Sequence, residues 1–351
     1  MNSTGDERIG VVALGTLRAR GTVEAVAGGR LLVRTPEELA VYEREDFLAG
    51  RTGGALHALR TEEHERAVPL PDGGFVVAGT ASVRALDPDG GPRWEHAHDP
   101  WHGTGRAQSP AVSPDGRLVS LVVPAIERDR SKAALVYDLE PERSYTWDEL
   151  LLLDAASGEV TGRQRLRSLT SGTVQYWRSD GGAVGVSCWT AWNSWSTWWA
   201  EPGAEGFRLL GSTWMHAMAG FLADGRALTQ RFAEHVFPAD DRDELAVFDP
   251  VSGERVALLD LAELAVDPEN DEFSSAEIVD GRHLVLPGQV YPSTGPPEHR
   301  HWLLAAEGLR PLGRLDYPRA VGPDVTPLGD GTWLTEDDGL LHRWSPADRG
   351  A

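Results

Sequence analysis

The stretch SPAVSPDGRLVSLVV, residues 109–123, decides the fold class of this chain. It places an Asp-Gly turn at 115–116 between two apolar runs. This pattern is typical of a β-hairpin, because Gly tolerates the positive φ of a tight turn. Similar turns occur six more times, as AGGR at 27–30, PDGG at 71–74, SDGG at 179–182, ADGR at 223–226, VDGR at 279–282 and GDGT at 329–332. Their second residues fall at 28, 72, 115, 180, 224, 280 and 330, and the smallest intervals, about 43 residues, match one four-stranded propeller blade.

A second turn, with Asp four residues before Gly, follows a short apolar run in three of these units. It reads DPDGG at 87–91, DAASG at 154–158 and DPVSG at 249–253. The Asp side chain of such a turn can hydrogen-bond its own backbone while Gly takes the unusual φ. Each unit therefore reads as four strands, a to d. In the fifth unit we expect them at about 217–222, 227–232, 244–248 and 255–260.

We therefore predict an all-β fold, a seven-bladed β-propeller of four-stranded antiparallel blades, as a single domain over residues 1–351. In the last unit, strands a, b and c fit near 323–328, 332–336 and 340–344, which leaves seven residues for a fourth strand. The apolar run IGVVALGTL at 9–17 precedes the first unit. We expect it to complete the last blade and close the ring, because an open ring would leave two exposed strand edges.

Several segments resemble known propeller repeats. VRALDPDGGPRWEH at 83–96 resembles the quinoprotein-type repeat, and SPAVSPDGRLVSLVV and PLGDGTWLTEDDGLLHRWSP (327–346) resemble WD-repeat-like blades. The Gly-His and Trp-Asp pairs of true WD repeats are absent, since 344–345 is Trp-Ser. Quinone-binding members of the quinoprotein-like group commonly carry two adjacent cysteines, and this chain has one cysteine in all. We therefore expect no cofactor other than a divalent metal ion.

The composition argues against two classes of partner. With 33 basic and 54 acidic residues, the net charge of −21 would repel the phosphates of nucleic acid. The uncharged segment 181–200 is rich in Gly, Ser, Thr and Asn, so we expect no membrane span. The single cysteine, Cys188, and an N-terminus that lacks the apolar core of a secretion signal favour a cytoplasmic location.

The predicted connections point to one functional face. In an antiparallel blade, the b–c connections and the d–a connections between blades share one face, which we name the loop face; the other is the turn face. The expected b–c connections are short in blades 1, 2 and 7. They are long in blades 3 to 6, at about 125–149, between Trp189 and Trp198, at 233–243 and at 287–300. Long loops on a rigid scaffold commonly carry function.

The blade 4 stretch SCWTAWNSWSTWWA, residues 187–200, contains five tryptophans. Each buries roughly 150–250 Å² in a core, so five fully exposed tryptophans are implausible. We expect Trp189, and either Trp198 or Trp199, to pack between blades. Trp192 and Trp195 fall in the predicted b–c connection, where they are candidates for an exposed aromatic platform.

The connection from blade 2 to blade 3, EHAHDPWHGTG at 95–105, supplies candidate metal ligands. These are His96, His98, Asp99 and His102, since neutral imidazole and carboxylate groups bind Zn²⁺ and similar ions. Their spacing matches no established zinc signature. The candidate ligand contacts on the loop face are Trp101, His102, Trp192, Trp195, His216 and His235.

The favoured function is a non-catalytic binding or scaffold propeller that presents this face to a protein, a peptide or a small ligand. The first alternative is a propeller enzyme, a metal-assisted lyase or a lactonase-type hydrolase, with its site at the mouth of the channel. The second is carbohydrate binding through exposed tryptophans. Propellers host many unrelated functions, so the fold does not decide between these hypotheses.

Overall fold

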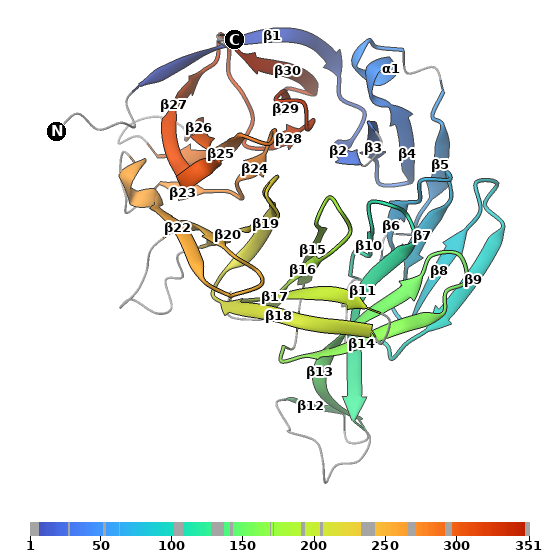
Figure 1. Ribbon diagram of the computed structural model, residues 1–351. Helices are drawn as coiled ribbons and strands as arrows, with labels where there is room; N and C mark the ends of the chain where they lie inside the picture. Colours follow the sequence, from blue (N-terminus) through green and yellow to red (C-terminus); the bar gives the residue numbers. More distant parts are fainter. Residues whose placement is uncertain are drawn as a thin grey trace.

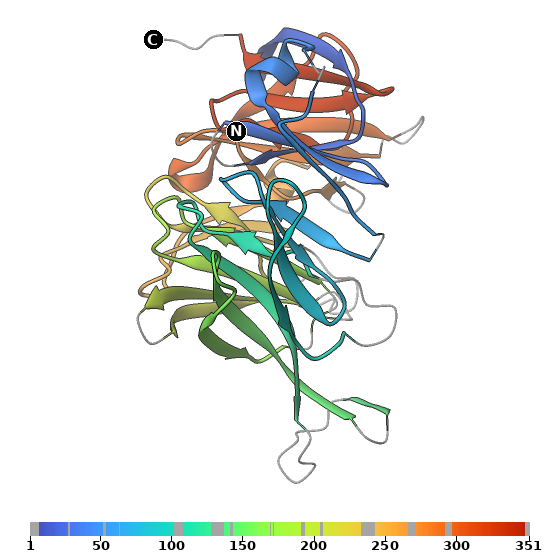
Figure 2. The same ribbon diagram turned by 90° about the vertical axis from the view of Figure 1, so that its right-hand side faces the viewer.

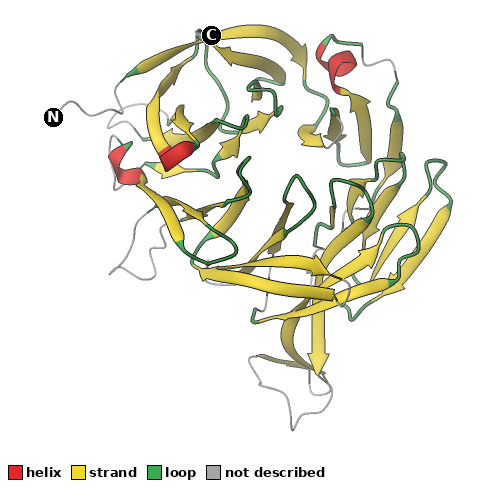
Figure 3. Ribbon diagram, viewed as in Figure 1, coloured by secondary structure: helices red, strands yellow, loops and turns green. Residues whose placement is uncertain are grey.

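The computed structural model describes residues 7–26, 29–51, 54–62, 64–101, 108–127, 137–140, 143–168, 170, 172–190, 194–203, 206–232, 243–265, 271–291 and 297–347. Within these ranges the chain is almost entirely β (Figure 3). Its strands form seven antiparallel groups of four that follow one another around a ring (Figure 1). The predicted β-propeller is thus confirmed.

Blades 1 to 3 come from consecutive strands. Blade 1 contains β2 (Thr22–Val26), β3 (Arg30–Arg34), β4 (Glu38–Glu43) and β5 (His57–Arg60). Blade 2 contains β6 (Arg66–Pro69), β7 (Phe75–Ala78), β8 (Ser82–Leu86) and β9 (Pro92–Ala97). Blade 3 contains β10 (Ala111–Val112), β11 (Leu118–Glu127), β13 (Arg143–Asp154) and β14 (Val160–Leu166), with β12 (Tyr137–Glu140) as an additional partner of β13. A short helix, α1 (Arg44–Leu48), lies between β4 and β5.

Blades 4 to 6 repeat this order. Blade 4 contains β15 (Gly172–Trp177), β16 (Val184–Thr190), β17 (Ser194–Gly203) and β18 (Gly206–Trp214). Blade 5 contains β19 (Ala217–Phe221), β20 (Ala227–Arg231), β21 (Glu244–Phe248) and β22 (Arg255–Asp260), close to the predicted bounds. Blade 6 contains β24 (Glu277–Ile278), β25 (His283–Val290), β26 (Glu298–Ala305) and β27 (Arg310–Asp316), with β23 (Glu272–Phe273) also paired to β25. Two 3₁₀ turns, η2 (Leu261–Glu263) and η3 (Glu307–Leu309), complete the connections.

The last blade is closed by the N-terminal strand, as the sequence predicted. It contains β28 (Val325–Pro327), β29 (Trp333–Asp337), β30 (Leu340–Pro346) and β1 (Arg8–Arg18). Strand β1 pairs antiparallel with β30 from Val11↔Pro346 to Arg18↔Leu340. Its first residues also pair in parallel with β27 of blade 6, from Arg8↔Arg314 to Gly10↔Asp316. Figure 1 shows β1 crossing from β27 to β30, so this one strand joins blades 6 and 7.

The a–b turns have a common chemistry. In six of the described turns the Asp carboxylate accepts a hydrogen bond from the backbone N–H two residues later, at 2.7 to 3.1 Å. The Gly after Asp has a positive φ in five of them, as at Gly73 (94°) and Gly116 (73°). The Asp-to-Gly turns behave similarly: Gly158 and Gly253 donate to the carbonyls of Asp154 and Asp249 at 2.8 Å. Local hydrogen bonding therefore fixes the turn face.

The hydrophobic core lies between the blades rather than in one central mass. Seven clusters of buried side chains are present, and each is shared by two neighbouring blades. One cluster, for example, joins Val76 of blade 2 to Leu121 and Leu151 of blade 3. Each sheet is therefore covered on both faces, which explains why strands b and c are nearly continuous apolar runs.

In blades 3 and 6, strands b and c extend further into the expected b–c connection than the sequence predicted. In blade 3, residues 125–127 and 143–149 belong to a continued ladder, with Ala125↔Trp147 and Glu127↔Ser144 in register, so much of the predicted loop is strand. Figures 1 and 2 show this β11–β13 hairpin projecting beyond the ring. In blade 6, the ladder likewise continues to Val290↔Glu298.

No helix among the described residues is long and apolar enough to cross a membrane.

Candidate functional site

The loop-face end of blade 4 carries three tryptophans, which we name the tryptophan edge: Trp189, Trp195 and Trp214. Trp214 ends strand β18, Trp189 is the last residue but one of strand β16, and Trp195 is the second residue of strand β17. Trp189 and Trp195 are directly opposite in the β16–β17 register, and Trp214 is opposite Ser196. Because adjacent residues of a strand point to opposite sides, Trp214 lies on the other face of the sheet from Trp195.

The exposure of these side chains differs from the sequence prediction. Trp195 belongs to strand β17 rather than to the b–c connection, since the alternating Ser/Trp pattern continues the ladder to Thr190↔Ser194. Trp189, which we expected in the core, is half-buried, as is Trp195. Trp199 is fully buried and packs against Phe248 of blade 5 with ring centroids 5.5 Å apart. Trp214 is 64% exposed, and the sequence reasoning did not single it out.

A buried polar network supports the tryptophan edge from below. The Ser187 and Thr197 hydroxyls lie 2.5 Å apart, and Thr197 donates to the backbone carbonyl of His216 at 2.6 Å. The backbone N–H of Met218 donates to Ser187 at 2.7 Å. Strands b and c of blade 4 are thereby tied to the connection that enters blade 5. The tryptophan edge therefore stands on a rigid base.

His216 lies within this base. Its Nε2 is 3.2 Å from the Glu244 carboxylate, and its Nδ1 is 3.2 Å from the Thr229 hydroxyl. The ring packs edge-on against Phe248, and the residue is buried. Burial lowers the pKa of His216 to about 4, with a further contribution from nearby arginines. Both ring nitrogens are thus occupied by the protein, so the structure gives His216 a packing role.

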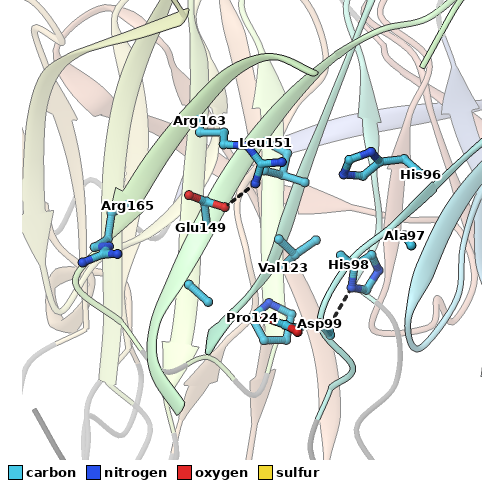
Figure 4. A pocket seen from close by; sticks show the side chains of 11 residues that line it. His96, Ala97, His98, Asp99, Val123, Pro124, Glu149, Leu151, Arg163 and Arg165 are labelled. Atoms are coloured by element: carbon cyan, nitrogen blue, oxygen red, sulfur yellow. Dashed lines mark hydrogen bonds and ion pairs between the residues drawn. The ribbon is translucent and has the colours of Figure 1, made fainter. Parts of the chain in front are cut away.

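A polar cavity of about 530 Å³ opens between blades 2 and 3, also at the loop face (Figure 4). One wall comes from the end of β9 and the residues after it, namely His96, Ala97, His98 and Asp99. The other comes from β13 and β14, with Glu149, Arg163 and Arg165, and the apolar floor includes Val123 and Leu151. Trp94 donates from Nε1 to the Ala155 carbonyl at 2.9 Å, which holds the outer strand of blade 2 against blade 3.

Three of the four candidate metal ligands line this cavity. His96, His98 and Asp99 all line it, and His98 Nδ1 is 2.7 Å from the backbone oxygen of Asp99. No three His, Cys, Asp or Glu side chains among the described residues are grouped closely enough to hold a metal ion. Burial lowers the pKa of both His96 and His98, and the charge of Arg163 contributes at His96.

The remaining candidates are distributed unevenly. Trp101 is half-buried against the cluster between blades 3 and 4, and its backbone N–H donates to the Thr80 carbonyl at 3.0 Å. His102, Trp192 and His235 lie outside the described residues. Sequence reasoning also missed Arg163 and Arg165; the alternation RQR at 163–165 was the available signal, because it places two arginines on one side of a strand.

Comparison with known proteins supports the fold and no single family. No protein-family model matches the sequence, and no curated protein is significantly similar to it. Among solved structures, BamB from Moraxella catarrhalis aligns with a TM-score of 0.56 at 11% identity, over 95% of this chain and 99% of that one. The WD40 domain of Toxoplasma gondii coronin aligns with a TM-score of 0.54 at 11% identity, over 98% and 90%. A prolyl endopeptidase aligns with a TM-score of 0.55 at 15% identity, over 95% of this chain but 50% of that one. The chain thus has the β-propeller fold.

Proposed function

We propose that this propeller is a binding protein that receives a peptide or a protein segment at the tryptophan edge of blade 4. The observation that carries the proposal is the 64% exposure of Trp214, at the loop-face end of the outer strand β18. The next two strands inward, β17 and β16, carry the half-buried Trp195 and Trp189 at the same end, on the other face of the sheet. Large aromatic side chains left at a surface in a group, rather than singly, are typical of recognition sites. Their contact area is large, and they lose little conformational entropy on binding.

The supporting network favours binding by a preformed surface. The Ser187–Thr197–His216 bonds are buried beneath the tryptophan edge, so the strands that carry it have little freedom to move. A rigid platform reduces the entropy that association costs. The net charge of −21 makes a basic or neutral segment the better partner and disfavours nucleic acid.

The test is selection of binding peptides from a random display library with the whole chain as bait. We expect the selected peptides to lose binding to a Trp214→Ala variant and to keep it with Val251→Ala. Val251 is a suitable control because it is 67% exposed and lies in a c–d turn on the turn face. Peptides that bind Trp214→Ala as well as the parent would refute the tryptophan edge as the site. A glycan array run in parallel would support the carbohydrate alternative if only sugars depended on Trp214.

We further propose that residues 1–351 fold as one domain and act in the cytoplasm. The seven clusters between blades support one cooperative unit, because loss of any blade would expose two of them. The single, buried Cys188 suits a reducing compartment. One calorimetric transition and recovery in the cytosolic fraction are expected; two separate transitions would contradict the single domain.

A further inference from the structure

The cavity between blades 2 and 3 contains an arginine without an acidic partner. Glu149 and Arg165 are directly opposite in the β13–β14 register, yet the Glu149 carboxylate bonds Arg163, with Nη1 and Oε2 2.8 Å apart. The Arg165 guanidinium has no ion pair or hydrogen bond among the described residues. Arg165 is exposed at the wall of the cavity, so its positive charge is accessible to a ligand.

Two imidazoles form the facing wall. His98 Nδ1 is 2.7 Å from the Asp99 carbonyl, so this nitrogen carries the proton of the neutral ring. His96 precedes it by two residues, on the same side of the chain. Figure 4 shows His96 and His98 on one side, Arg165 on the other, and the Glu149–Arg163 pair between them. The cavity therefore has a cation on one wall and two titratable nitrogen groups on the other.

The polar groups of the cavity come from two neighbouring blades. Among the described residues they are His96, His98 and Asp99 from blade 2, and Glu149, Arg163 and Arg165 from strands β13 and β14. Strand β11 contributes the uncharged Val123, Pro124 and Ala125. Because the Glu149 carboxylate is bonded to Arg163, the guanidinium of Arg165 is the charged group of this wall that a ligand can reach.

We propose that this cavity binds a small organic oxyanion, a molecule with a phosphate or carboxylate group attached to an apolar or planar body. Arg165 supplies the main charge contact, Arg163 supports it, and the imidazole N–H of His96 donates from the opposite wall. Val123 and Leu151 provide an apolar floor for the body of the ligand. The volume of about 530 Å³ is within the range of small-molecule sites, roughly 300–1,000 Å³, and far exceeds the needs of a bare ion.

Calorimetric titration of the whole chain with four probes tests this site: adenosine monophosphate, adenosine, citrate and inorganic phosphate. We expect adenosine monophosphate or citrate to bind at least about tenfold more tightly than adenosine, because hydrogen bonds to charged groups are the strong ones. Preference for adenosine monophosphate would identify a phosphate ester as the ligand class, and preference for citrate would identify a polycarboxylate.

Two variants with the same loss of charge give the decisive comparison. Arg165→Gln should weaken binding by about tenfold or more, whereas Arg310→Gln should leave it within about twofold. Arg310 is an exposed arginine that begins strand d of blade 6, away from the cavity. Both variants should melt like the parent. The proposal is overturned if neither adenosine monophosphate nor citrate binds at millimolar concentration, if adenosine or inorganic phosphate binds as tightly as these two, or if both variants lose binding equally.

The outcome is independent of the peptide-binding proposal. Trp214→Ala should leave the affinity for the anionic probe unchanged, and Arg165→Gln should leave peptide binding unchanged. A single site serving both ligands would show loss of both activities in either variant, which would contradict the assignment of two sites.

Discussion

Replacement of Trp199 tests the packing between blades 4 and 5 quantitatively. The side chain is fully buried and contacts the cluster that contains Met218 and Phe248. A tryptophan that buries roughly 150–250 Å² contributes about 4–6 kcal/mol at ~25 cal/mol per Å² as an upper bound, and truncation of a large core aromatic to Ala typically costs about 3–5 kcal/mol. Trp199→Ala should therefore lower the free energy of unfolding by about 3–5 kcal/mol.

The expected change in melting temperature follows from the size of the chain. At about 2.1 cal/mol/K per residue, unfolding of 351 residues has an entropy of about 0.7 kcal/mol/K, so Trp199→Ala should lower the melting temperature by about 4–7 °C. Trp199→Phe should lower it by less than about 2 °C. It keeps most of the apolar contact and removes an indole N–H that has no hydrogen-bond partner among the described residues.

Trp214→Ala is the matched comparison for this series, because the same side chain is removed from a surface position. We expect a change in melting temperature of less than about 1.5 °C, since surface substitutions usually alter the free energy of unfolding by about 0.5 kcal/mol or less. Differential scanning calorimetry measures all three variants. Equal losses for Trp214→Ala and Trp199→Ala would refute the assignment of Trp199 to the core and Trp214 to the surface.

Three further predictions concern closure, pH and the cysteine. Deletion of residues 1–18 removes the fourth strand of blade 7 and should produce aggregation or a large loss of thermal stability; a truncated chain that melts like the parent would refute closure by β1. His216 has a pKa of about 4 in the folded protein and about 6.5 in the unfolded chain. Its contribution to the free energy of unfolding, about 3 kcal/mol, is therefore present above pH 6.5 and is lost as the pH falls toward 4. Urea titrations at pH 7 and pH 5 should show this loss in the parent and a smaller one in His216→Gln. Cys188 is fully buried, and burial raises the pKa of its thiol, so a thiol reagent should label it only at the rate of unfolding.

The repeating parts of the fold were predictable because their chemistry is local. In each turn, an Asp carboxylate accepts a hydrogen bond from the backbone N–H two residues later, and a Gly adopts a positive φ. Both features depend on only a few consecutive residues. The role of 9–17 could be inferred because the last blade lacked a strand, and β1 indeed pairs with β30 from Val11 to Arg18. In the fifth unit, the two turn motifs likewise placed β19 to β22 to within one residue.

The site was less predictable because it depends on strands brought together by the ring. Spacing alone could not tell that Trp195 continues a ladder with Trp189, or that Trp214 is exposed. His216 looked like a ligand contact, but Glu244 and Thr229, distant in sequence, occupy its nitrogens. Arg165 lines a cavity together with His96 of the preceding blade. A single sequence does not reveal that residues of two neighbouring blades line the same cavity.

The two faces of the ring differ in which side chains remain available to a ligand. On the turn face, the Asp carboxylates are engaged by their own backbone, and Arg178 beside Asp180 and Arg226 beside Asp224 hold the pKa of those carboxyls below the usual range. These groups are occupied in maintaining the turns. On the loop face, the indole of Trp214 is exposed, and the Arg165 guanidinium has no partner among the described residues. A ligand can contact only side chains that are accessible and are not engaged within the folded chain. We therefore expect this propeller to bind its ligands on the loop face, over blades 2 to 4.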